Sequence, residues 1–311
     1  MRVLVTGAAG CLGQALLPLL CAEADIDTVT GTDLRETVWA HKKYGHRRTD
    51  LRHADATREL AEYDAVIHLA YVVLKGRQSA SAMRAVNVDA SATFLRAAVD
   101  AGVPRIIHLS SAAVYGSAEL ADESQPFDPL PDFLYGQHKA ALEQSLAGLS
   151  DQIVVLRPHV ILGRHAQPTL RQLLRLPVCL RLPDPQPQLQ CVHECDVATA
   201  ILAALRSQTT GPFNLAHPDT YNMQQLSHQL HRHVLAVPPA VAAAALHAVN
   251  GLTGWGGEPG WLAGLQKTLT LDCQRAQTLL NWSASTSLDD TLMDTLGQRT
   301  SRSKPHSDST R

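Results

Sequence analysis

Two side chains that could exchange a proton with a bound molecule lie four residues apart in the segment Tyr135-Gly136-Gln137-His138-Lys139. On a helix this spacing places both side chains on one face, a single turn apart. A lysine ammonium near a phenol stabilises the tyrosinate and lowers the phenol pKa from about 10. Tyr135 would then be a usable acid or base, with Lys139 as its activator. Because such a pair also occurs by chance in helices, its context decides.

A glycine-rich turn near the N-terminus has the spacing of a phosphate-binding loop. Gly7, Gly10 and Gly13 follow an apolar run and lead directly into a helical pattern. They allow a tight turn, close approach of the backbone to a pyrophosphate, and an anion at the helix N-terminus. Asp33 lies 20 residues after Gly13, where a carboxylate can accept the hydroxyls of an adenosine ribose. Asp33 favours NAD, and Arg35 leaves NADP open because its guanidinium could receive a 2′-phosphate.

A serine motif, SSAAVYG, begins at Ser110, directly after another apolar run. If that run is a strand, the serine hydroxyls emerge at the carboxyl end of a sheet, which is the edge where the glycine turn also lies. One hydroxyl there could hold a carbonyl or alkoxide oxygen while Tyr135 transfers the proton and a nicotinamide gives or takes hydride.

These residues need elements that bring them to one edge, and the hydrophobic pattern supplies them. Short β-branched runs predict strands at Arg2–Thr6, Asp27–Thr32, Ala65–Leu69, Arg105–Ser110 and Ile153–Arg157. Helical patterns lie between them at Leu12–Ala22, Ser79–Ala101 and Tyr135–Leu149. Strands that alternate with helices indicate an α/β fold with a doubly wound parallel sheet. We therefore expect a Rossmann-like dinucleotide-binding domain over residues 1–160.

The alternation fades after about residue 160, which predicts a smaller substrate-binding lobe over residues 161–300, interleaved with the sheet. Five prolines between Pro168 and Pro187 exclude a central strand or a long helix there and favour an irregular cover over the site. Further elements are expected at Asp196–Leu205 (helix), Pro212–Leu215 (strand), Asn222–Val234 (helix) and Pro239–Gly251 (helix). Residues 301–311 lack apolar side chains and are expected to be a disordered tail.

Composition narrows the partners. The 311 residues carry a formal charge of −2, so no overall field favours nucleic acid or a membrane, and a small-molecule substrate fits better. The six cysteines lack the spacing of a disulfide framework or a zinc site, which favours a reducing, cytoplasmic location. The stretch from Cys191 to Cys195 reads as a strand running into a helix, and we expect no metal. Glycines interrupt the apolar N-terminus, so it does not resemble an export signal.

Together these motifs resemble those of the extended short-chain dehydrogenases/reductases, the NAD-dependent epimerase/dehydratase family, over roughly residues 1–300. TGAAGCLG is similar to the family's TGxxGxxG, SSAAVYG to its serine motif and YGQHK to its YxxxK. Weaker matches to its HLA, NV, RPxxVYG and FVHVxDVA segments begin at His68, Asn87, Arg157 and Cys191.

The resemblance implies roles for individual residues. Ser111 would hold the reacting oxygen, Tyr135 would be the acid/base, and Lys139 would activate Tyr135 and bind a ribose. With these, the cofactor-binding residues would be Gly7, Gly10, Cys11, Leu12, Gly13, Asp33, Arg35, Asp50, Leu51, Leu69, Ala70, Tyr71, Asn87, Leu109 and Val160. Asp50 and Leu51 would form the adenine-side pair. Substrate would be bound by Ser111, Ala112, His159 and Arg171. For three residues a structural role is also considered. Asn87 could equally be a buried residue that forms hydrogen bonds with the backbone, and for His193 and Asp196 we favour the roles of an anchor and a helix cap. The resemblance also implies a homodimer.

The chain departs from the family in its substrate motifs. Nucleotide-sugar members carry an arginine just before the FVHV segment, where this chain has Leu189-Gln190, and dehydratases carry Asp-Glu where it has Ala112-Ala113. Other arginines could supply charge, although each reads more readily as a solvated side chain: Arg164, Arg171, Arg175 and Arg181. We expect an NAD(P)-dependent dehydrogenase or reductase acting on a secondary alcohol or carbonyl. A nucleotide-sugar 4-epimerase with tightly bound NAD is the alternative, and a non-catalytic dinucleotide sensor is a third.

Overall fold

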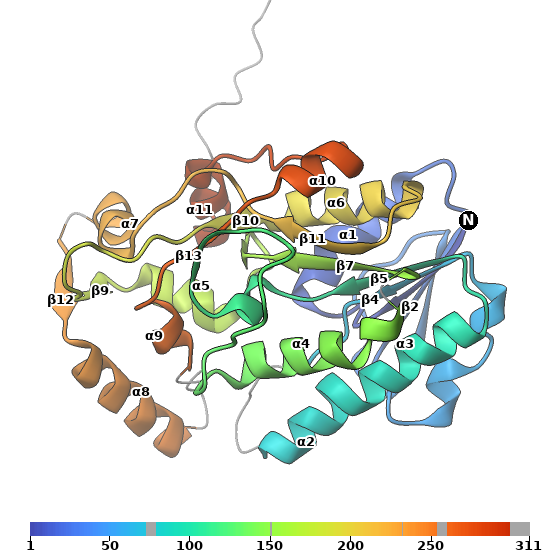
Figure 1. Cartoon of the computed structure of the whole chain (residues 1–311), viewed down its shortest axis with the longest axis horizontal. Coiled ribbons are helices and arrows are strands. Elements are labelled where there is room, and N and C mark those ends of the chain that lie inside the picture. The colour runs from blue at the N-terminus through green and yellow to red at the C-terminus, as the bar shows by residue number, and fades with distance from the viewer. Residues whose placement is uncertain (73–78, 150, 232, 254–259, 299–311) are drawn as a thin grey trace, which may run out of the picture.

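The computed structural model describes residues 1–72, 79–149, 151–231, 233–253 and 260–298. Within them, seven parallel strands form one central sheet (Figure 1). In their order across the sheet the strands are β11 (Gly211–Leu215), β7 (Ile153–Pro158), β5 (Arg105–Leu109), β4 (Ala65–His68), β1 (Arg2–Thr6), β2 (Thr28–Asp33) and β3 (Tyr44–Arg48). The carboxyl ends of β1, β2, β4 and β5 therefore meet at one edge, as the sequence predicts.

Helices cover both faces of this sheet (Figure 1). On one face lie α1 (Cys11–Ala22) and α6 (Glu194–Arg206), and on the other α3 (Ser91–Asp100) and α4 (Leu134–Ser145). Strand β1 shows how the layers share one strand, because Val3 and Val5 pack towards α1 and α6 while Leu4 packs towards α3. A strand buried on both faces needs apolar residues at every position, which is why these runs do not alternate.

The helix predicted over Ser79–Ala101 consists of three consecutive parts. These are α2 (Ala80–Arg84), a π-helical turn (Ala85–Ala90) and α3. In the part of the chain that the structure describes, short 3₁₀ turns lie at Ala54–Thr57, Leu60–Glu62, Ala112–Tyr115 and Ala147–Leu149.

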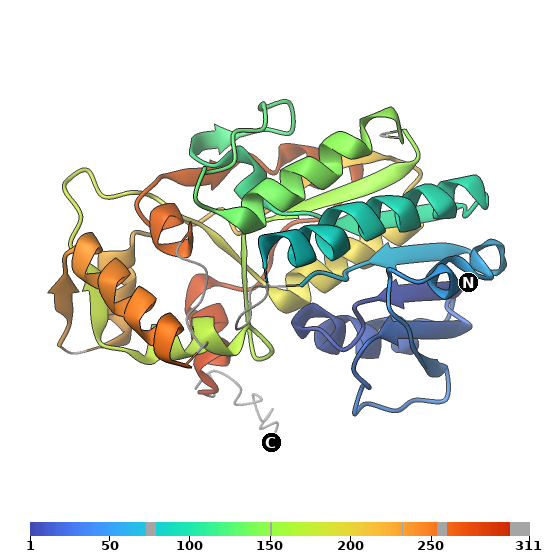
Figure 2. The same ribbon diagram turned by 90° about the horizontal axis from the view of Figure 1, so that it is seen from below.

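A smaller lobe lies at the end of the molecule opposite the N-terminus (Figure 2). This lobe contains parallel pairs of strands, namely β8 (Val160–Leu162) with β10 (Cys191–His193), β9 (Val178–Leu180) with β12 (Leu235–Val237), and β6 (Ala118–Ala121) with β13 (Leu269–Leu271). Of these strands, β6 comes from the first half of the chain. The remaining helices are α5 (Pro168–Arg175), α7 (Met223–Leu230), α8 (Pro239–Thr253), α9 (Gly260–Gly264), α10 (Gln274–Leu279) and α11 (Leu288–Leu296). Segment 194–215 returns from this lobe to the sheet as α6 and β11.

The α/β fold with a doubly wound parallel sheet is confirmed, and each strand predicted for the sheet is present within one residue at either end. Three details differ. The edge strand β3 has no counterpart among the predicted strands. The proline-rich stretch is less irregular than expected, since it contains α5, with Pro168 in its first turn, and β9. The helix predicted to reach Val234 ends at Leu230. The predicted tail, residues 301–311, lies outside the described residues.

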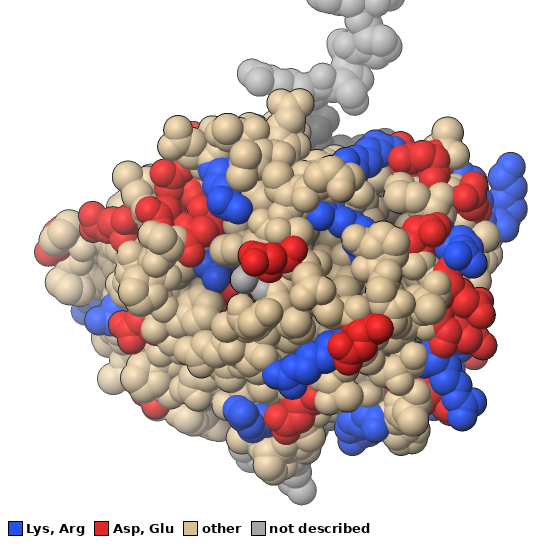
Figure 3. All heavy atoms as spheres, turned by 45° about the vertical axis from the view of Figure 1, so that its right-hand side comes forward, with Lys and Arg blue, Asp and Glu red and all other residues tan. Residues whose placement is uncertain are grey.

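The surface carries no large area of one charge on the face that Figure 3 shows, where basic and acidic side chains are interspersed. This distribution agrees with the formal charge of −2. Among the described helices, none combines the length and the apolar character needed to cross a membrane.

Candidate active site

The glycine turn is shaped so that only glycine fits at two of its positions. Gly7 has a φ of +71°, and a Cβ atom there would lie 2.6 Å from the backbone nitrogen of Ala70. A Cβ atom on Gly13 would lie 2.2 Å from the carbonyl oxygen of Ala8. The turn thus lies against the end of β4, and α1 begins at Cys11 with no side chain capping its N-terminus. Such an end, with its backbone N–H groups and positive dipole, suits a pyrophosphate.

Asp33, the last residue of β2, is fixed beside this turn. Its carboxylate accepts hydrogen bonds from the backbone N–H of Ala9 at 3.1 Å and from that of Arg35 at 2.9 Å. The Arg35 guanidinium donates to the carbonyl oxygen of Ala9 at 3.0 Å. The structure therefore brings the predicted ribose-binding carboxylate, the glycine turn and Arg35 into one small area.

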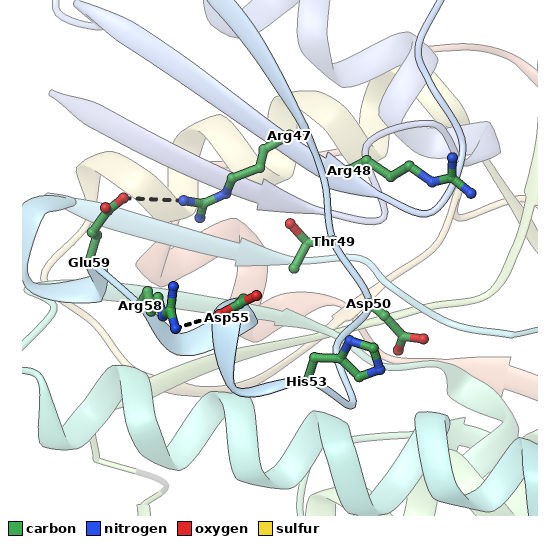
Figure 4. Close-up of a pocket in the computed structure, with 8 residues that line it drawn as sticks. All are labelled: Arg47, Arg48, Thr49, Asp50, His53, Asp55, Arg58 and Glu59. Atoms are coloured by element: carbon green, nitrogen blue, oxygen red, sulfur yellow. Dashed lines mark hydrogen bonds and ion pairs between the residues drawn. The ribbon is translucent and has the colours of Figure 1, made fainter.

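The predicted adenine-side residues lie one strand farther along. The carboxylate of Asp50 is paired with Arg52 at 2.5 Å, and this hydrogen bond lowers the Asp50 pKa to about 2. Leu51 packs against the cluster under α3. Asp50 also lines a hollow that contains two ion pairs (Figure 4). Arg47 pairs with Glu59 at 3.2 Å, and Arg58 pairs with Asp55, three residues before it.

The predicted catalytic residues meet where β5 and α4 approach each other. Ser111 follows β5, and its hydroxyl accepts from the backbone N–H of Ala113 at 3.2 Å. Tyr135 is in the first turn of α4, where burial raises its pKa and a hydrogen bond with Ser111 lowers it by a smaller amount. The serine and the phenol are thus in contact, as the proposed chemistry requires.

Lys139 lies one turn farther along α4 and is almost fully buried, with 4% of its surface exposed. Its ammonium donates to the carbonyl oxygen of Leu109 at 2.6 Å. Burial lowers its pKa to about 7, against the smaller opposing effect of Glu143. Burial thus works against the charged form of this side chain, while the Leu109 carbonyl supplies a hydrogen-bond acceptor for it.

Tyr71 joins the pair. The Lys139 ammonium lies 4.5 Å from the centre of the Tyr71 ring, a cation–π distance, and the Tyr71 and Tyr135 rings meet edge to face at 5.0 Å. The Tyr71 hydroxyl also donates to the carbonyl oxygen of Tyr135 at 3.4 Å. From the sequence, Tyr71 is predicted only to line the cofactor, whereas in the structure its ring lies against both predicted catalytic side chains.

Two further aromatic residues at this point were missed. Phe133 lies 5.5 Å from the Tyr135 ring, and Trp261 of α9 lies 5.7 Å from Tyr135 and 4.9 Å from Phe133. Phe133 is close to the YxxxK motif and could have been considered. Trp261 is 126 positions away from Tyr135 in the chain, and no local pattern connects it with the site.

A buried charged network was also missed. Glu143 lies two helical turns after Tyr135 and forms an ion pair with Arg157 of β7 at 2.6 Å, and both side chains are 5% exposed. Glu143 also accepts a hydrogen bond from the hydroxyl of Ser110, the neighbour of Ser111. Arg157 donates to the hydroxyl of Tyr115 at 2.7 Å, and Tyr115 donates to Asn214 of β11 at 2.8 Å. This network joins α4 to three strand ends beneath the site.

Two other predicted residues have structural partners, and a third is buried. The Asn87 side chain accepts from the backbone N–H of Val72 at 2.7 Å and donates to its carbonyl at 2.9 Å, as its structural interpretation holds. His159, whose pKa burial lowers to about 4, is neutral, accepts from the backbone N–H of Val160 and donates to the carbonyl of Leu269. Ala112 is buried at the start of a 3₁₀ turn.

The lobe arginines also have partners. Arg171 donates from Nε to the carbonyl of Thr295 at 3.0 Å. Arg175 donates to that of Leu296 at 3.2 Å, Arg181 to that of Ala236 at 3.2 Å, and Arg164 pairs with Asp294 at 3.2 Å.

An anchor and a helix cap are both present, but the two residues have exchanged roles: His193 is the cap and Asp196 is the anchor. His193 is the N-cap of α6, since its Nδ1 accepts from the backbone N–H of Cys195 at 3.2 Å. Asp196 accepts from Ser285 and from the backbone N–H of Thr286, so it ties α6 to the segment before α11. In the described part of the chain, no group of three potential metal ligands comes together.

Comparison with known proteins gives one family match. The model of a family described as the NAD dependent epimerase/dehydratase family matches residues 3–223. Among curated proteins, an uncharacterised protein of Mycobacterium bovis is 27% identical over 240 residues, which cover 76% of this chain but only 24% of the relative. The chain thus spans about a quarter of that relative's length. A 4-hydroxy-2-methyl-3-oxo-4-farnesyl-3,4-dihydroquinoline-1-oxide ketoreductase of Stigmatella aurantiaca is 31% identical over 186 residues, 56% of this chain and 54% of the ketoreductase.

A similar solved structure is a dTDP-glucose 4,6-dehydratase of Streptomyces venezuelae, crystallised with NAD and TYD. It has a TM-score of 0.74 and 24% identity, and the match covers 96% of both chains. At this identity the likeness shows a common fold.

Proposed function

Because the chain belongs to the NAD dependent epimerase/dehydratase family, we propose that it transfers hydride between NAD and a secondary alcohol or carbonyl group of a small substrate. One observation carries the proposal: Ser111, Tyr135 and Lys139 come together at the sheet edge that also holds the glycine turn and Asp33. A protein that only senses a dinucleotide would need the glycine turn and Asp33, but it would not need Ser111, Tyr135 and Lys139.

The chain's own residues would hold the cofactor and move the proton. The glycine turn and the N-terminus of α1 would bind the pyrophosphate, and Asp33 the adenosine ribose. When bound, the nicotinamide supplies or accepts the hydride. Ser111 would hold the substrate oxygen, and Tyr135 would give that oxygen a proton or take one from it. Protonated Lys139 would stabilise the tyrosinate, lowering a phenol pKa that burial alone raises.

The 4-epimerase alternative uses the same residues on a nucleotide sugar, and one similar solved structure is a complex with UDP-glucose and NAD. Dehydration fits less well, because Ala112 and Ala113 leave no acid and base after the serine.

We also propose that the protein is a cytoplasmic homodimer joined through α3 and α4. The six cysteines lack the spacing of a disulfide framework, which supports the reducing compartment, and sedimentation at micromolar concentration would test the dimer.

The decisive experiment is calorimetric titration of the cofactor-stripped protein with NAD and, separately, with NADP. We expect NAD to bind more tightly, and Asp33→Ala to weaken NAD at least tenfold by removing the ribose contact. The exposed carboxylate of Asp100 on α3 provides a matched control, and Asp100→Ala should bind NAD as the unaltered protein does. Failure of both dinucleotides to bind would overturn the proposed function.

A further inference from the structure

An aromatic wall surrounds the predicted acid/base. Tyr71, Phe133 and Trp261 each lie with their ring centres 5.0–5.7 Å from that of Tyr135. Phe133 is buried, whereas Trp261 is only partly covered by the protein. The Tyr135 hydroxyl thus works beside rings that offer apolar surface and, on the Trp261 side, an indole that is still accessible.

The position of Trp261 is set by tight packing. Gly260 begins α9, and a Cβ atom there would lie 2.5 Å from the carbonyl oxygen of Asp132 and 2.5 Å from the Cα atom of Phe133. Because no side chain separates the two backbones, α9 lies directly on the segment that leads into α4. Trp261 is therefore held next to Tyr135 by the backbone, and a bound molecule that reaches the phenol also meets the indole.

The segment that carries this tryptophan is almost free of charge. Between His233 and Lys267, Glu258 is the one Asp, Glu, Lys or Arg residue in the sequence. Helix α8 in this segment has no charged residue, and its Val241 and Val249 are 56% and 48% exposed. Both views of the fold place α8 and α9 at the same end of the molecule (Figures 1 and 2). The chain around Trp261 is therefore poor in side chains that could bind a charged substrate.

The arginines of the lobe do not replace the charged side chains that this segment lacks. The lobe arginines described above are engaged with backbone carbonyls or with Asp294, mostly on or next to α11. A diphosphate needs such groups, preferably as two parallel N–H donors of one guanidinium, and burying it without them is costly. Each of these four guanidinium groups is already tied to a partner within the lobe, which limits its freedom to turn towards a bound diphosphate.

Building on the proposed function, we propose that the substrate is a ketone or secondary alcohol on an uncharged, apolar skeleton, and that Trp261 packs against that skeleton beside Tyr135. In the reductive direction, hydride from NADH adds to the carbonyl carbon, the C=O π electrons move to oxygen, and the Tyr135 hydroxyl supplies the proton. The products are the alcohol and NAD, and the proton is replaced from water.

The test measures binding first and turnover second, with the full chain loaded with NADH. The probes are 2-butanone, 2-hexanone, 2-octanone and 2-decanone, the bicyclic 2-decalone, and UDP as the charged alternative. We expect 2-decanone and 2-decalone to raise the thermal unfolding midpoint and UDP to leave it unchanged. We also expect kcat/KM for NADH oxidation to rise up to about fourfold for each added methylene that becomes buried.

Three variants separate the role of Trp261 from a general loss of packing. Trp261→Ala should remove most of the dependence on chain length and the 2-decanone shift, whereas Trp261→Phe should keep a large part of both. Trp39, which packs on Tyr44 near the opposite edge strand, provides the control, and Trp39→Ala should leave both readouts unchanged. A midpoint raised by UDP but by neither ketone would overturn the apolar assignment while leaving the proposed function intact. Ketone effects that Trp261→Ala retains would overturn the role of Trp261.

Discussion

Lys139 shows how one buried side chain links chemistry to stability. It is held between the carbonyl of Leu109 and the ring of Tyr71, and burial lowers its pKa from 10.5 to about 7. The unfolded chain keeps the ordinary value, so between pH 7 and 10.5 it binds more protons than the folded chain, and stability rises with pH across this window. The destabilising effect is fully present below pH 7 and disappears above 10.5.

Replacing Lys139 by methionine should therefore stabilise the ligand-free protein while removing its activity. At pH 7 we expect a gain of about 1–4 kcal/mol, which allows for the lost hydrogen bond to Leu109. The gain should shrink as the pH approaches 10.5. Urea unfolding of both proteins at a series of pH values checks this, and a difference independent of pH would show that burial does not perturb this lysine.

Tyr135 can be tested by removing a single oxygen atom. Tyr135→Phe keeps the ring contacts with Tyr71, Phe133 and Trp261 but cannot transfer a proton. We expect the rate of ketone reduction to fall at least ~100-fold, within the range for a general acid or base, while NAD affinity measured by calorimetry changes little. Turnover close to that of the unaltered protein would refute the assignment.

At the scale of elements, the site depends on how α4 is fixed against the strands. The ion pair between Glu143 and Arg157, with Ser110 bonded to the same carboxylate, connects α4 to β7 and to the residue before Ser111. Buried charges are costly to separate because each is left without its partner in a medium of low polarity.

Glu143→Leu alone should therefore destabilise the protein by about 3–5 kcal/mol, since it leaves Arg157 buried and uncompensated. The double variant Glu143→Leu with Arg157→Leu should recover a substantial part of that loss. A double-mutant cycle from urea unfolding measures the coupling. If the two single changes simply add, the pair does not act as a unit.

The sequence predicts elements well where both faces of a strand are buried, as in β1, β4 and β5, because a continuous apolar run is then required. It fails for β3, whose residues YGHRR contain no β-branched side chain. As the last strand of the sheet, β3 has a neighbour on one side only, and pairing with β2 determines its conformation more than burial does.

Among site residues, the glycine turn, Ser111, Tyr135 and Lys139 are recognisable as local motifs. Glu143 and Trp261 cannot be recognised in this way, because each belongs to the site through a contact with a distant segment. Glu143 pairs with Arg157 of β7, and Trp261 packs on Tyr135.

At the scale of the whole molecule, the lobe and the sheet share their elements. The edge strand β11 and the covering helix α6 come from the second half of the chain, and Asp196 of α6 binds the segment before α11. A boundary at residue 160 thus separates strands of one sheet, although the smaller lobe lies largely beyond it.

We therefore expect thermal unfolding to be one cooperative transition. Far-UV circular dichroism, which reports mainly on helices of both parts, and tryptophan fluorescence, which includes Trp261 of the lobe, should give coincident midpoints. Saturating NAD should raise both midpoints equally. Two resolved transitions would show that the lobe is an independent unit.

The order of strands across the sheet also has a consequence during synthesis. Strand β7 is complete by Pro158, but β11, which pairs with it, starts only at Gly211, after the whole of the proline-rich segment and of α6. While the ribosome makes the intervening residues, the nascent sheet carries an open, apolar edge at β7, and such edges recruit other chains. This protein should accordingly depend on chaperones most during that interval, and a chain truncated just before Gly211 should aggregate even though its glycine turn and its YxxxK motif are already in place.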